Sequence, residues 1–373
     1  MSMPAALISS GVTLSALLPE LDGLPDITVT GVASDSRLVD AGCLFLATAG
    51  ATTHGIAFAD QVVERGAYAI AYEPEGAGAV PTSLAIPVFP VPGLEQQLGD
   101  IANRFYGRPS EALDVYAVTG TNGKTTVAWL LKQCQAALGS RAGYIGTLGA
   151  GIDGLDTGPG LTTPGAVELH ARLAEFRDAG ATAAAIEVSS HALDQRRIDG
   201  VRIRAALFTN LSRDHLDYHG SMNAYFEAKA KLFLECGPEA KIINLDTEYG
   251  AELASRCGEN VVTVSTRFDR VANGRPYVFV RSVVATETGS LVRVDTSWGS
   301  AEFALAMPGD FNVANAVLVM ATLLFEGADL DAVAREPERQ RGAVHRQGLV
   351  AEVADAVVVA HQVLDGADVV LVP

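Results

Sequence analysis

The sequence predicts an α/β fold in which a doubly wound, mostly parallel sheet follows a smaller α/β domain. From residue 114 to about residue 265, apolar runs of strand length alternate with segments of helical periodicity. Runs such as residues 181–188 (ATAAAIEV) are apolar throughout, which is typical of parallel strands covered on both faces. Right-handed crossovers between such strands give a doubly wound sheet. Residues 276–306 instead alternate around the turn sequence ETGS and predict a β-meander.

The elements divide at the stretch 106–113 (YGRPSEAL), which contains glycine and proline. We therefore predict an N-terminal domain over residues 1–109, a central domain over 110–333 and an atypical tail over 334–373. In the first domain we expect strands at 27–37, 43–50, 67–73 and 86–91 and a helix at 56–66. In the second we expect strands at 114–120, 141–149, 181–188, 204–211, 241–246 and 261–265, and helices at 125–138, 164–180, 224–237, 251–258 and 312–327.

Composition and charge limit the possible functions. Of the 373 residues, 49% are hydrophobic and 19% are charged, which is enough apolar material for a packed core. The net charge of −17 argues against general binding to nucleic acid or to anionic membranes. A phosphate-bearing substrate is still compatible with this charge, because backbone N–H groups and a few cations can hold an anion locally.

The cysteines and the N-terminus predict a cytoplasmic protein. The four cysteines lack C-x-x-C spacing and are expected to be reduced thiols: Cys43, Cys134, Cys236 and Cys257. The apolar N-terminus has no basic start, and Glu20 and Asp22 follow at once, which argues against a signal peptide. No run of 18 apolar residues could span a bilayer. We expect a soluble monomer without a nucleic-acid partner and without membrane insertion.

The strongest chemical signal is GTNGKTT at residues 120–126, between a predicted strand and a predicted helix. Glycines let the backbone wrap a phosphate, Lys124 can neutralise the β- and γ-oxygens, and the Thr125 hydroxyl can hold Mg²⁺. Val118 stands where the usual G-x-x-x-x-G-K-[ST] pattern has its first glycine, so a glycine turn that merely contains a lysine is the alternative. The expected ATP-binding residues of this loop are Gly120, Thr121, Asn122, Gly123, Lys124, Thr125 and Thr126.

The loop resembles that of the Mur ligases and of folylpolyglutamate synthetase, which join a carboxylate to an amine with ATP. Further motifs resemble the Mur ligases that add the third residue of the peptidoglycan peptide: DSR (35–37), LTTP (161–164), EVSSHALDQRR (187–197), NLSRDHLDYHG (210–220) and YFEAKAKLF (225–233). They follow the family's order and cover roughly residues 10–330. DSR argues against folylpolyglutamate synthetase, and EVSSHALDQRR argues against it and against other Mur ligases. The sequence is therefore identified as a member of the Mur ligase family.

The resemblance implies that the catalytic residues are Lys124, Glu187, His215 and Lys229. Glu187 ends a predicted strand, where open α/β sheets bind ligands, and it would hold Mg²⁺ together with Thr125. His215, in the loop after the next strand, would hold a second Mg²⁺. Taken without the resemblance, Glu187 could be a solvated strand-end carboxylate and His215 a structural histidine.

Lys229 lies on a predicted helix, two residues before Lys231, so the two side chains point to different faces. On the residues alone it reads as a surface lysine. In the family the matching lysine is carbamylated by CO₂, and the resulting anion helps to organise the Mg²⁺ ions. Only a neutral amine reacts with CO₂, and nearby cations would lower the pKa of the amine in that direction.

The resemblance also assigns substrate contacts. Ser36 would lie near the uridine diphosphate of a nucleotide sugar, and Asn312 and Asn315 near the base of ATP. Residues along the sugar, diphosphate and peptide would be Thr162, Thr163, Ser189, Gln195 and Arg197. Competing structural roles are helix N-caps: Thr162 or Thr163 for the helix that follows, and Asn312 for the helix that it opens.

The implied reaction uses ATP and Mg²⁺. The D-glutamate carboxylate of UDP-N-acetylmuramoyl-L-Ala-D-Glu would attack the γ-phosphate, and the amine of diaminopimelate or lysine would then displace phosphate from the acyl phosphate. General resemblance favours diaminopimelate. The family's third, Rossmann-like domain is not recognisable in residues 334–373, where the D-N-P-R stretch linked to diaminopimelate selection is absent. We therefore expect that domain to be missing or vestigial, with a non-catalytic nucleotide-sugar-binding protein as the alternative.

Overall fold

The computed structural model describes residues 11–334 except residues 51, 157–160, 268–273 and 288. Packing divides the chain into two compact units. The first contains the chain up to residue 112 together with residues 164–179 and 195–201; the second contains residues 113–163, 180–194 and the chain from 202 onward. The tail predicted over 334–373 lies, but for its first residue, outside the described residues.

The first unit is built on a four-stranded parallel sheet of order β3-β4-β5-β6. Its strands are β3 (Gly31–Ala33), β4 (Cys43–Ala47), β5 (Ala69–Tyr72) and β6 (Val88–Pro90). Its helices are α1 (Leu14–Leu17), α2 (Ala59–Glu64), α3 (Leu94–Phe105) and α5 (Ala166–Asp178), with short 3₁₀ turns at η1 (Ser36–Leu38), η2 (Gly55–Phe58) and η3 (Pro109–Glu111). The core of this unit joins apolar residues of α3 and α5 to those of β4 and β5.

The single strand expected over residues 27–37 is wrong. The chain forms two short strands there, β2 (Thr28–Val29) and β3, which belong to different sheets: β2 pairs with β1 (Val12–Thr13), and β3 pairs with β4. The segment then turns at η1, where the Asp35 carboxylate accepts the Arg37 backbone N–H at 2.9 Å. Alternation along the sequence indicates extended chain but does not say which strand is the partner.

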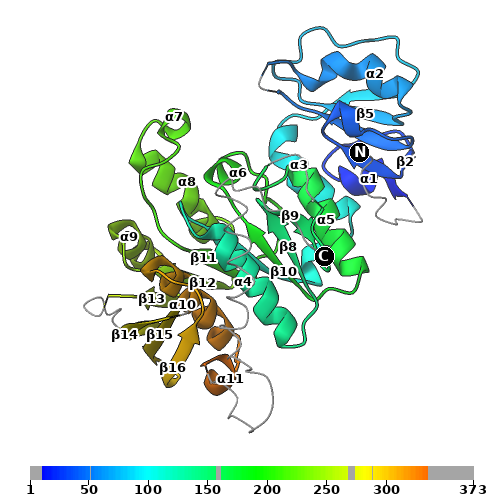
Figure 1. The fold of residues 1–373 in the computed structure, drawn as a ribbon. Helices are drawn as coiled ribbons and strands as arrows, with labels where there is room; N and C mark the ends of the chain where they lie inside the picture. The colour runs from blue at the N-terminus through cyan, green and yellow to red at the C-terminus, as the bar shows by residue number, and fades with distance from the viewer. Residues whose placement is uncertain (1–10, 51, 157–160, 268–273, 288, 335–373) are drawn as a thin grey trace. The chain divides into compact units, whose positions relative to one another are not determined.

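The second unit contains a ten-stranded mixed sheet of order β16-β15-β14-β13-β12-β11-β7-β10-β8-β9 (Figure 1). The strands from β14 through β8 run parallel in that order, which confirms the predicted doubly wound sheet. They are β7 (Asp114–Thr119), β8 (Ala142–Gly146), β10 (Ala183–Glu187), β11 (Ala205–Phe208), β12 (Ala240–Asn244), β13 (Val261–Ser265) and β14 (Tyr277–Thr286).

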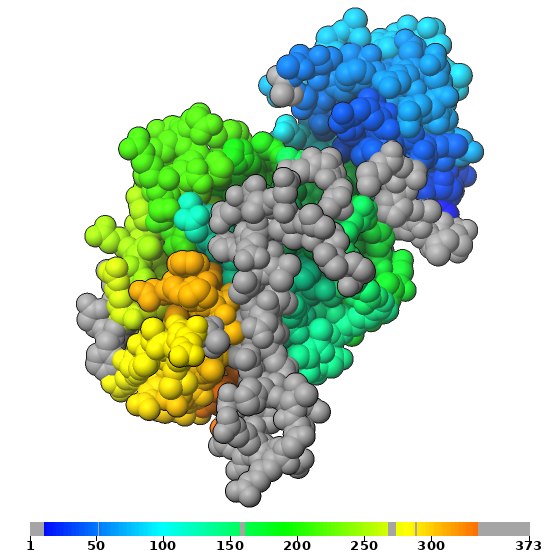
Figure 2. Space-filling view, in the orientation of Figure 1, coloured from blue at the N-terminus to red at the C-terminus, as the bar shows by residue number. Residues whose placement is uncertain are grey.

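The predicted β-meander is confirmed at one end of this sheet. β14 pairs antiparallel with β15 (Gly289–Thr296), and β15 pairs antiparallel with β16 (Gly299–Leu305). At the other end, β9 (Gly149–Gly151) forms an antiparallel hairpin with β8. In the space-filling view, the meander (yellow) lies beside α10 (Asp310–Phe325, orange), which packs against β12, β13 and β14 (Figure 2).

Helices complete the second unit and position its loops. They are α4 (Lys124–Ala137), α6 (Ser190–Asp194), α7 (Leu216–His219), α8 (Met222–Leu234), α9 (Glu248–Arg256) and α11 (Leu330–Ala334). Strands β8, β9 and β10 lie on one side of β7 in the sheet, and the strands from β11 onward lie on its other side. The strand order therefore reverses at β7. Open α/β sheets bind ligands at the carboxyl ends of the strands beside such a reversal. Among the described helices, none is long and apolar enough to cross a membrane.

Candidate nucleotide-binding site

The loop Gly120–Gly123 joins β7 to α4, as the sequence predicts. Gly120 has φ 149° and Gly123 has φ 85°, a region that side chains with a Cβ rarely adopt. Neither glycine has room for a side chain. A Cβ on Gly120 would meet the Asn210 carbonyl oxygen at 2.9 Å, and one on Gly123 would meet the Asn315 amide. The glycines therefore permit both the backbone turn and its close packing.

A second loop, residues 209–212 after β11, holds the glycine loop from one side. The Thr121 N–H donates to the Asn210 carbonyl (2.9 Å), and the Asn122 N–H donates to the Asn210 side-chain oxygen (3.1 Å). The Asn122 carbonyl accepts from the Thr209 hydroxyl (2.6 Å) and from the Asn210 amide (3.1 Å). These bonds fix the loop before any ligand is bound, which reduces the conformational entropy that the loop loses on binding.

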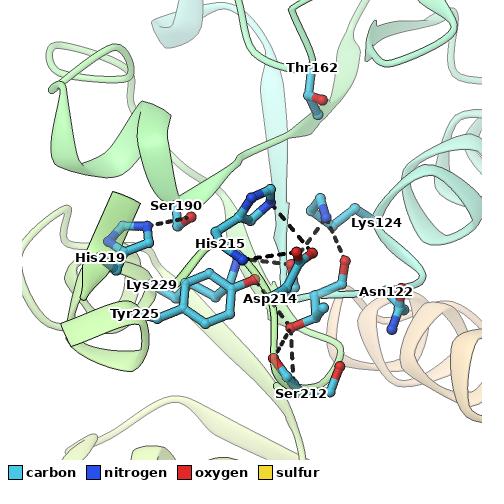
Figure 3. A network of polar contacts seen from close by, with 12 residues as sticks. Asn122, Lys124, Thr162, Ser190, Ser212, Asp214, His215, His219, Tyr225 and Lys229 are labelled. Carbon is cyan, nitrogen blue, oxygen red and sulfur yellow. Dashed lines mark hydrogen bonds and ion pairs between the residues drawn. The ribbon is translucent and has the colours of Figure 1, made fainter. Parts of the chain in front are cut away.

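Two lysines from different helices meet at one carbonyl of this loop. Nζ of Lys124, the first residue of α4, donates to the carbonyls of Gly120 (3.1 Å) and Thr121 (2.8 Å). Lys229, on α8, donates from Nζ to the same Gly120 carbonyl at 2.8 Å. Figure 3 shows both lysines at the loop, with the ring of Tyr225 beside Lys229.

Lys229 is only 1% exposed, so the alternative of a surface lysine is wrong. Burial lowers the pKa of its amine well below the usual value, and the charge of Lys124 lowers it further, against an opposing effect of Asp214. The amine also lies 4.7 Å from the centre of the Tyr225 ring. Lys231, by contrast, pairs with Asp194 at 3.1 Å near the surface. Burial likewise lowers the pKa of Lys124, while Glu187 and Asp214 raise it.

Glu187 ends β10 and is fully buried, so it is not a solvated carboxylate. One oxygen accepts from the Tyr144 hydroxyl and from the Thr147 N–H (2.8 Å); the other accepts from the hydroxyls of Thr125 (2.9 Å) and Thr147 (3.3 Å). Gly146 makes this arrangement possible, because a Cβ there would overlap Glu187 and Tyr144. These four hydrogen-bond donors offset the cost of burying the Glu187 side chain.

His215 lies in a cluster of aromatic rings formed by the segment after β11 and by His191 of α6. Its backbone is left-handed (φ 49°), and its Nε2 lies 3.5 Å from Asp214. The His191 ring lies 5.0 Å from the His215 ring and 5.6 Å from that of His219, centre to centre. His219 is hydrogen-bonded to the Ser190 hydroxyl at 2.9 Å. Its pKa is lowered, first by burial and then by His191.

Among the described residues, no group of three or more His, Cys, Asp or Glu side chains is arranged to hold a metal ion. The Thr125 hydroxyl and the Glu187 carboxylate, 2.9 Å apart, are oxygen donors of the type that Mg²⁺ prefers, and it usually takes only one or two carboxylates beside phosphate oxygens. These two residues therefore fit Mg²⁺ bound together with a nucleotide. For His215 and Lys229, metal binding stays a prediction.

Asn312 and Asn315 lie on α10 and are both buried. Asn315 packs against Gly123, which brings α10 to the glycine loop. The Asn312 amide donates to the Pro308 carbonyl at 2.8 Å. The alternative role of Asn312 as helix cap is wrong, because α10 begins at Asp310 and Gly309 is its N-cap.

The residues expected along the nucleotide sugar lie in both units. In the second unit, Thr163 is buried and bonds the Glu187 carbonyl (2.8 Å) and the Ser189 N–H (3.1 Å), while the Ser189 hydroxyl accepts from Ala192 (3.1 Å). The Thr162 hydroxyl is bonded to that of Thr147 (3.2 Å). Neither threonine caps α5, whose N-cap is Gly165, so that alternative is wrong.

The other three expected residues lie in the first unit. Ser36 is buried in η1, where the neighbouring Asp35 carboxylate pairs with Arg37 at 2.6 Å. Arg37 holds the pKa of Asp35 below its ordinary value. The guanidinium of Arg197 donates to the Gln195 side-chain oxygen at 2.6 and 3.1 Å.

Several residues of the site were not expected from the sequence. They are Tyr144, Thr147, Thr209, Asn210, Asp214 and Tyr225. Asn210, Asp214 and Tyr225 lie inside motifs already singled out, at 210–220 and 225–233. Tyr225 links the two parts of the site, because its hydroxyl lies 3.2 Å from that of Thr121 and its ring lies under Lys229. The strand ends that carry these residues were predicted, but not which side chains would turn toward the loop.

A glycine-rich loop between a parallel strand and a helix, with a lysine at the helix start and a carboxylate at the end of the neighbouring parallel strand, defines a P-loop α/β domain. Residues 118–323 match the Mur ligase middle domain, and residues 28–106 match the Mur ligase family catalytic domain. The chain belongs to the Mur ligase family, as the motifs predicted.

Relatives and a solved structure give the same family. The chain is similar to the UDP-N-acetylmuramoyl-L-alanyl-D-glutamate--2,6-diaminopimelate ligases of Xanthomonas campestris (48% identical over 66% of this chain and 49% of the relative) and Pseudomonas aeruginosa (40% over 90% and 67%). A solved structure of a ligase with that name matches 92% of this chain and 66% of its own, with TM-score 0.71 and 29% identity. The chain thus spans about half to two thirds of the length of these relatives.

Proposed function

We propose that the protein is an ATP-dependent ligase that joins meso-diaminopimelate to the D-glutamate carboxylate of UDP-N-acetylmuramoyl-L-Ala-D-Glu in peptidoglycan synthesis. The observation that carries the proposal is the convergence of Lys124, Thr125 and Glu187 on one glycine loop. The relatives at 40–48% identity that are named for this reaction support it.

In the proposed reaction, the substrate carboxylate attacks the γ-phosphorus of ATP, and the bond to the β,γ-bridging oxygen breaks with release of ADP. The amine of diaminopimelate then attacks the acyl phosphate carbon; phosphate leaves with the bonding pair, and the amine loses a proton to solvent. Both steps depend on positioning and on neutralising phosphate charge rather than on a protein nucleophile.

Lys124 is the residue that neutralises the phosphates. Its Nζ already lies on the loop, bonded to two carbonyls, and exchanges them for phosphate oxygens when ATP binds. Mg²⁺ bound with the nucleotide would stabilise negative charge on the phosphates, and Thr125 and Glu187 are the residues that would hold it. Glu187 keeps a fixed orientation because Tyr144 and Thr147 hold its other oxygen. We assign the base of ATP to the side of the loop where Asn315 packs against Gly123.

Lys229 is proposed to react with CO₂. Burial and the neighbouring Lys124 lower the pKa of its amine, which favours the neutral form that attacks CO₂. The amine nitrogen bonds to the carbon of CO₂ and loses a proton to solvent, and the product is a carbamate, an anion that would be able to hold a metal ion. His215 is also proposed as a metal ligand. It lies after β11, the strand that pairs with β7 beside the glycine loop.

We assign the contacts with the nucleotide sugar to six residues, each described within its own unit. Ser36, Gln195 and Arg197 of the first unit would contact the uridine diphosphate and the peptide, since a guanidinium fork suits phosphate or carboxylate. In the second unit, the hydroxyls of Thr162, Thr163 and Ser189 would contact the sugar and diphosphate.

Calorimetric titration tests the binding part of the proposal. UDP-N-acetylmuramoyl-L-Ala-D-Glu and AMP-PNP with Mg²⁺ should each bind the wild-type chain. Thr125→Val removes the hydroxyl beside Glu187 and should weaken Mg²⁺·AMP-PNP by about tenfold or more, with the sugar nucleotide unaffected. Failure of a folded wild-type chain to bind either ligand would contradict the proposal.

A further inference from the structure

The turn at residues 195–201 carries Gln195 and Arg197 and is part of the first unit. Within the turn, the Asp199 N–H donates to the Arg196 carbonyl (3.2 Å), and the Val201 N–H donates to the Ile198 carbonyl (3.1 Å). These two bonds shape the turn but do not attach it to the rest of the unit. Two attachments of the turn come from α3 and α5.

Close backbone packing provides one attachment. A Cβ on Gly99 of α3 would overlap the Asp199 carbonyl, so only glycine lets the turn approach this closely. Gly200 has φ 79°, and a Cβ there would meet the Gly99 carbonyl at 2.9 Å and Asn103 at 3.2 Å. Ile198 is also buried. The middle of the turn is thus pressed against α3.

His170 of α5 provides the polar attachment. It is fully buried, and its Nε2 lies 2.9 Å from the Asp199 carbonyl oxygen. A carbonyl only accepts, so Nε2 must carry the hydrogen, and Nδ1 is then a bare nitrogen. Nδ1 is buried and has no hydrogen-bond partner among the described residues. The bond to the Asp199 carbonyl is therefore the hydrogen bond that this buried histidine makes among the described residues. A purely apolar side chain would fill the same space without leaving a buried nitrogen unpaired.

We infer that His170 is a positioning residue for the nucleotide-sugar substrate: it holds the Asp199 carbonyl and so fixes the direction in which Gln195 and Arg197 project. The inference rests on the proposed function, which assigns those two residues to the substrate. A guanidinium fork is useful only in a defined orientation, since its two parallel hydrogen bonds must meet both oxygens of a phosphate or carboxylate. A turn held by packing alone would allow more orientations and bind more weakly.

Three variants test the inference. His170→Leu removes the donor and keeps the apolar volume; His170→Gln retains an amide N–H near the place of Nε2. Val167→Ala is the control, because Val167 lies one helical turn away on α5, in a core cluster that contains no residue of the turn. Each variant is titrated by calorimetry with UDP-N-acetylmuramoyl-L-Ala-D-Glu and with Mg²⁺·AMP-PNP, and its melting temperature is measured.

His170→Leu should weaken the sugar nucleotide by about tenfold and leave Mg²⁺·AMP-PNP unchanged. His170→Gln should restore the affinity to within about threefold of the wild type. Val167→Ala should lower the melting temperature without changing either affinity. The inference is overturned if His170→Leu binds the sugar nucleotide like the wild type, or if His170→Gln is no better than His170→Leu.

The outcome also separates this inference from the function on which it rests. A wild-type chain that binds the sugar nucleotide while His170→Leu binds it equally well refutes the role of His170 alone. A folded wild-type chain that does not bind the sugar nucleotide refutes both. If His170→Leu does not fold, the comparison of His170→Gln with His170→Asn, whose shorter side chain does not reach Asp199, decides the question: equal affinities overturn the inference.

Discussion

Replacing Lys229 by methionine should make the protein more stable and less active. Methionine has nearly the length of lysine but no amine. In the wild type, burial and Lys124 lower the pKa of the Lys229 amine, whereas the unfolded chain has an ordinary pKa of about 10.4. Between its folded pKa and about 10.4, the unfolded state therefore binds more protons at this site than the folded state does. The contribution of this site to the free energy of unfolding consequently rises with pH over that window, and Lys229→Met loses this contribution.

The magnitude follows from the contacts of the amine. The lost hydrogen bond to the Gly120 carbonyl is worth about 1 kcal/mol, and that carbonyl keeps Lys124 as a donor at 3.1 Å. Folding must remove the proton that this amine carries in the unfolded chain, and the cost, up to about 1.4 kcal/mol for each pH unit below about 10.4, should exceed this loss near pH 7. The advantage of methionine should then shrink by up to about 1.4 kcal/mol for each pH unit, because each unit makes deprotonation of the wild-type amine easier.

Urea unfolding at pH 7, 8 and 9 in CO₂-free buffer measures this difference. Tryptophan fluorescence is a suitable signal, because both tryptophans, Trp129 and Trp298, belong to the same unit as Lys229. The matched control is Lys231→Met: this lysine is partly exposed and paired with Asp194, so its replacement should give no such pH slope. A difference between wild type and Lys229→Met that does not change with pH would show a charged amine in the folded protein and refute the reasoning.

Two further substitutions distinguish the site from its scaffold. Gly146→Ala would place a Cβ against Glu187 and Tyr144, and should cost about 1–3 kcal/mol of stability in urea unfolding together with about tenfold in Mg²⁺·AMP-PNP affinity; wild-type affinity would contradict the role of the Glu187 carboxylate. Tyr116→Phe removes the hydroxyl that donates to Glu326 at 2.5 Å, and should lower the free energy of unfolding by about 1.5–3 kcal/mol. Nucleotide affinity should not change, because Glu326 lies at the C-terminal end of α10 and not at the glycine loop. A change in affinity there would argue against this separation.

The sequence was informative where local patterns decide the structure. The apolar run before Gly120 and the helix after it predicted the loop correctly, and apolar runs located β10 and β11. It was less informative where tertiary packing decides. The threonines before α5 had the chemistry of a helix cap, but Thr163 bonds the end of β10 instead, and Gly165 takes the cap position. The same hydroxyl can serve as a helix cap or in a tertiary hydrogen bond, so the residue type alone does not decide between the two roles.

Lys229 shows where general propensity outweighed a local pattern. On α8 the buried residues Tyr225, Phe226, Leu232 and Phe233 lie three and four positions from Lys229, so helical spacing places this lysine in the middle of the inward face. A lysine is nevertheless a surface residue by general propensity, and the prediction from the residues alone followed that propensity. Tyr144 was likewise not expected, because the sequence indicates that β8 is a strand but not that the ring is placed diagonally to Glu187 on the neighbouring strand β10.

The most direct test of the central claim is phosphate release by the purified chain with ATP, Mg²⁺, bicarbonate and UDP-N-acetylmuramoyl-L-Ala-D-Glu, with meso-diaminopimelate or L-lysine added in parallel. We predict phosphate release that depends on meso-diaminopimelate and that Lys124→Ala abolishes. Release with L-lysine instead would contradict the assigned amino acid. No release with either amino acid, from a chain that binds both nucleotides, would contradict the proposal that this chain is a ligase.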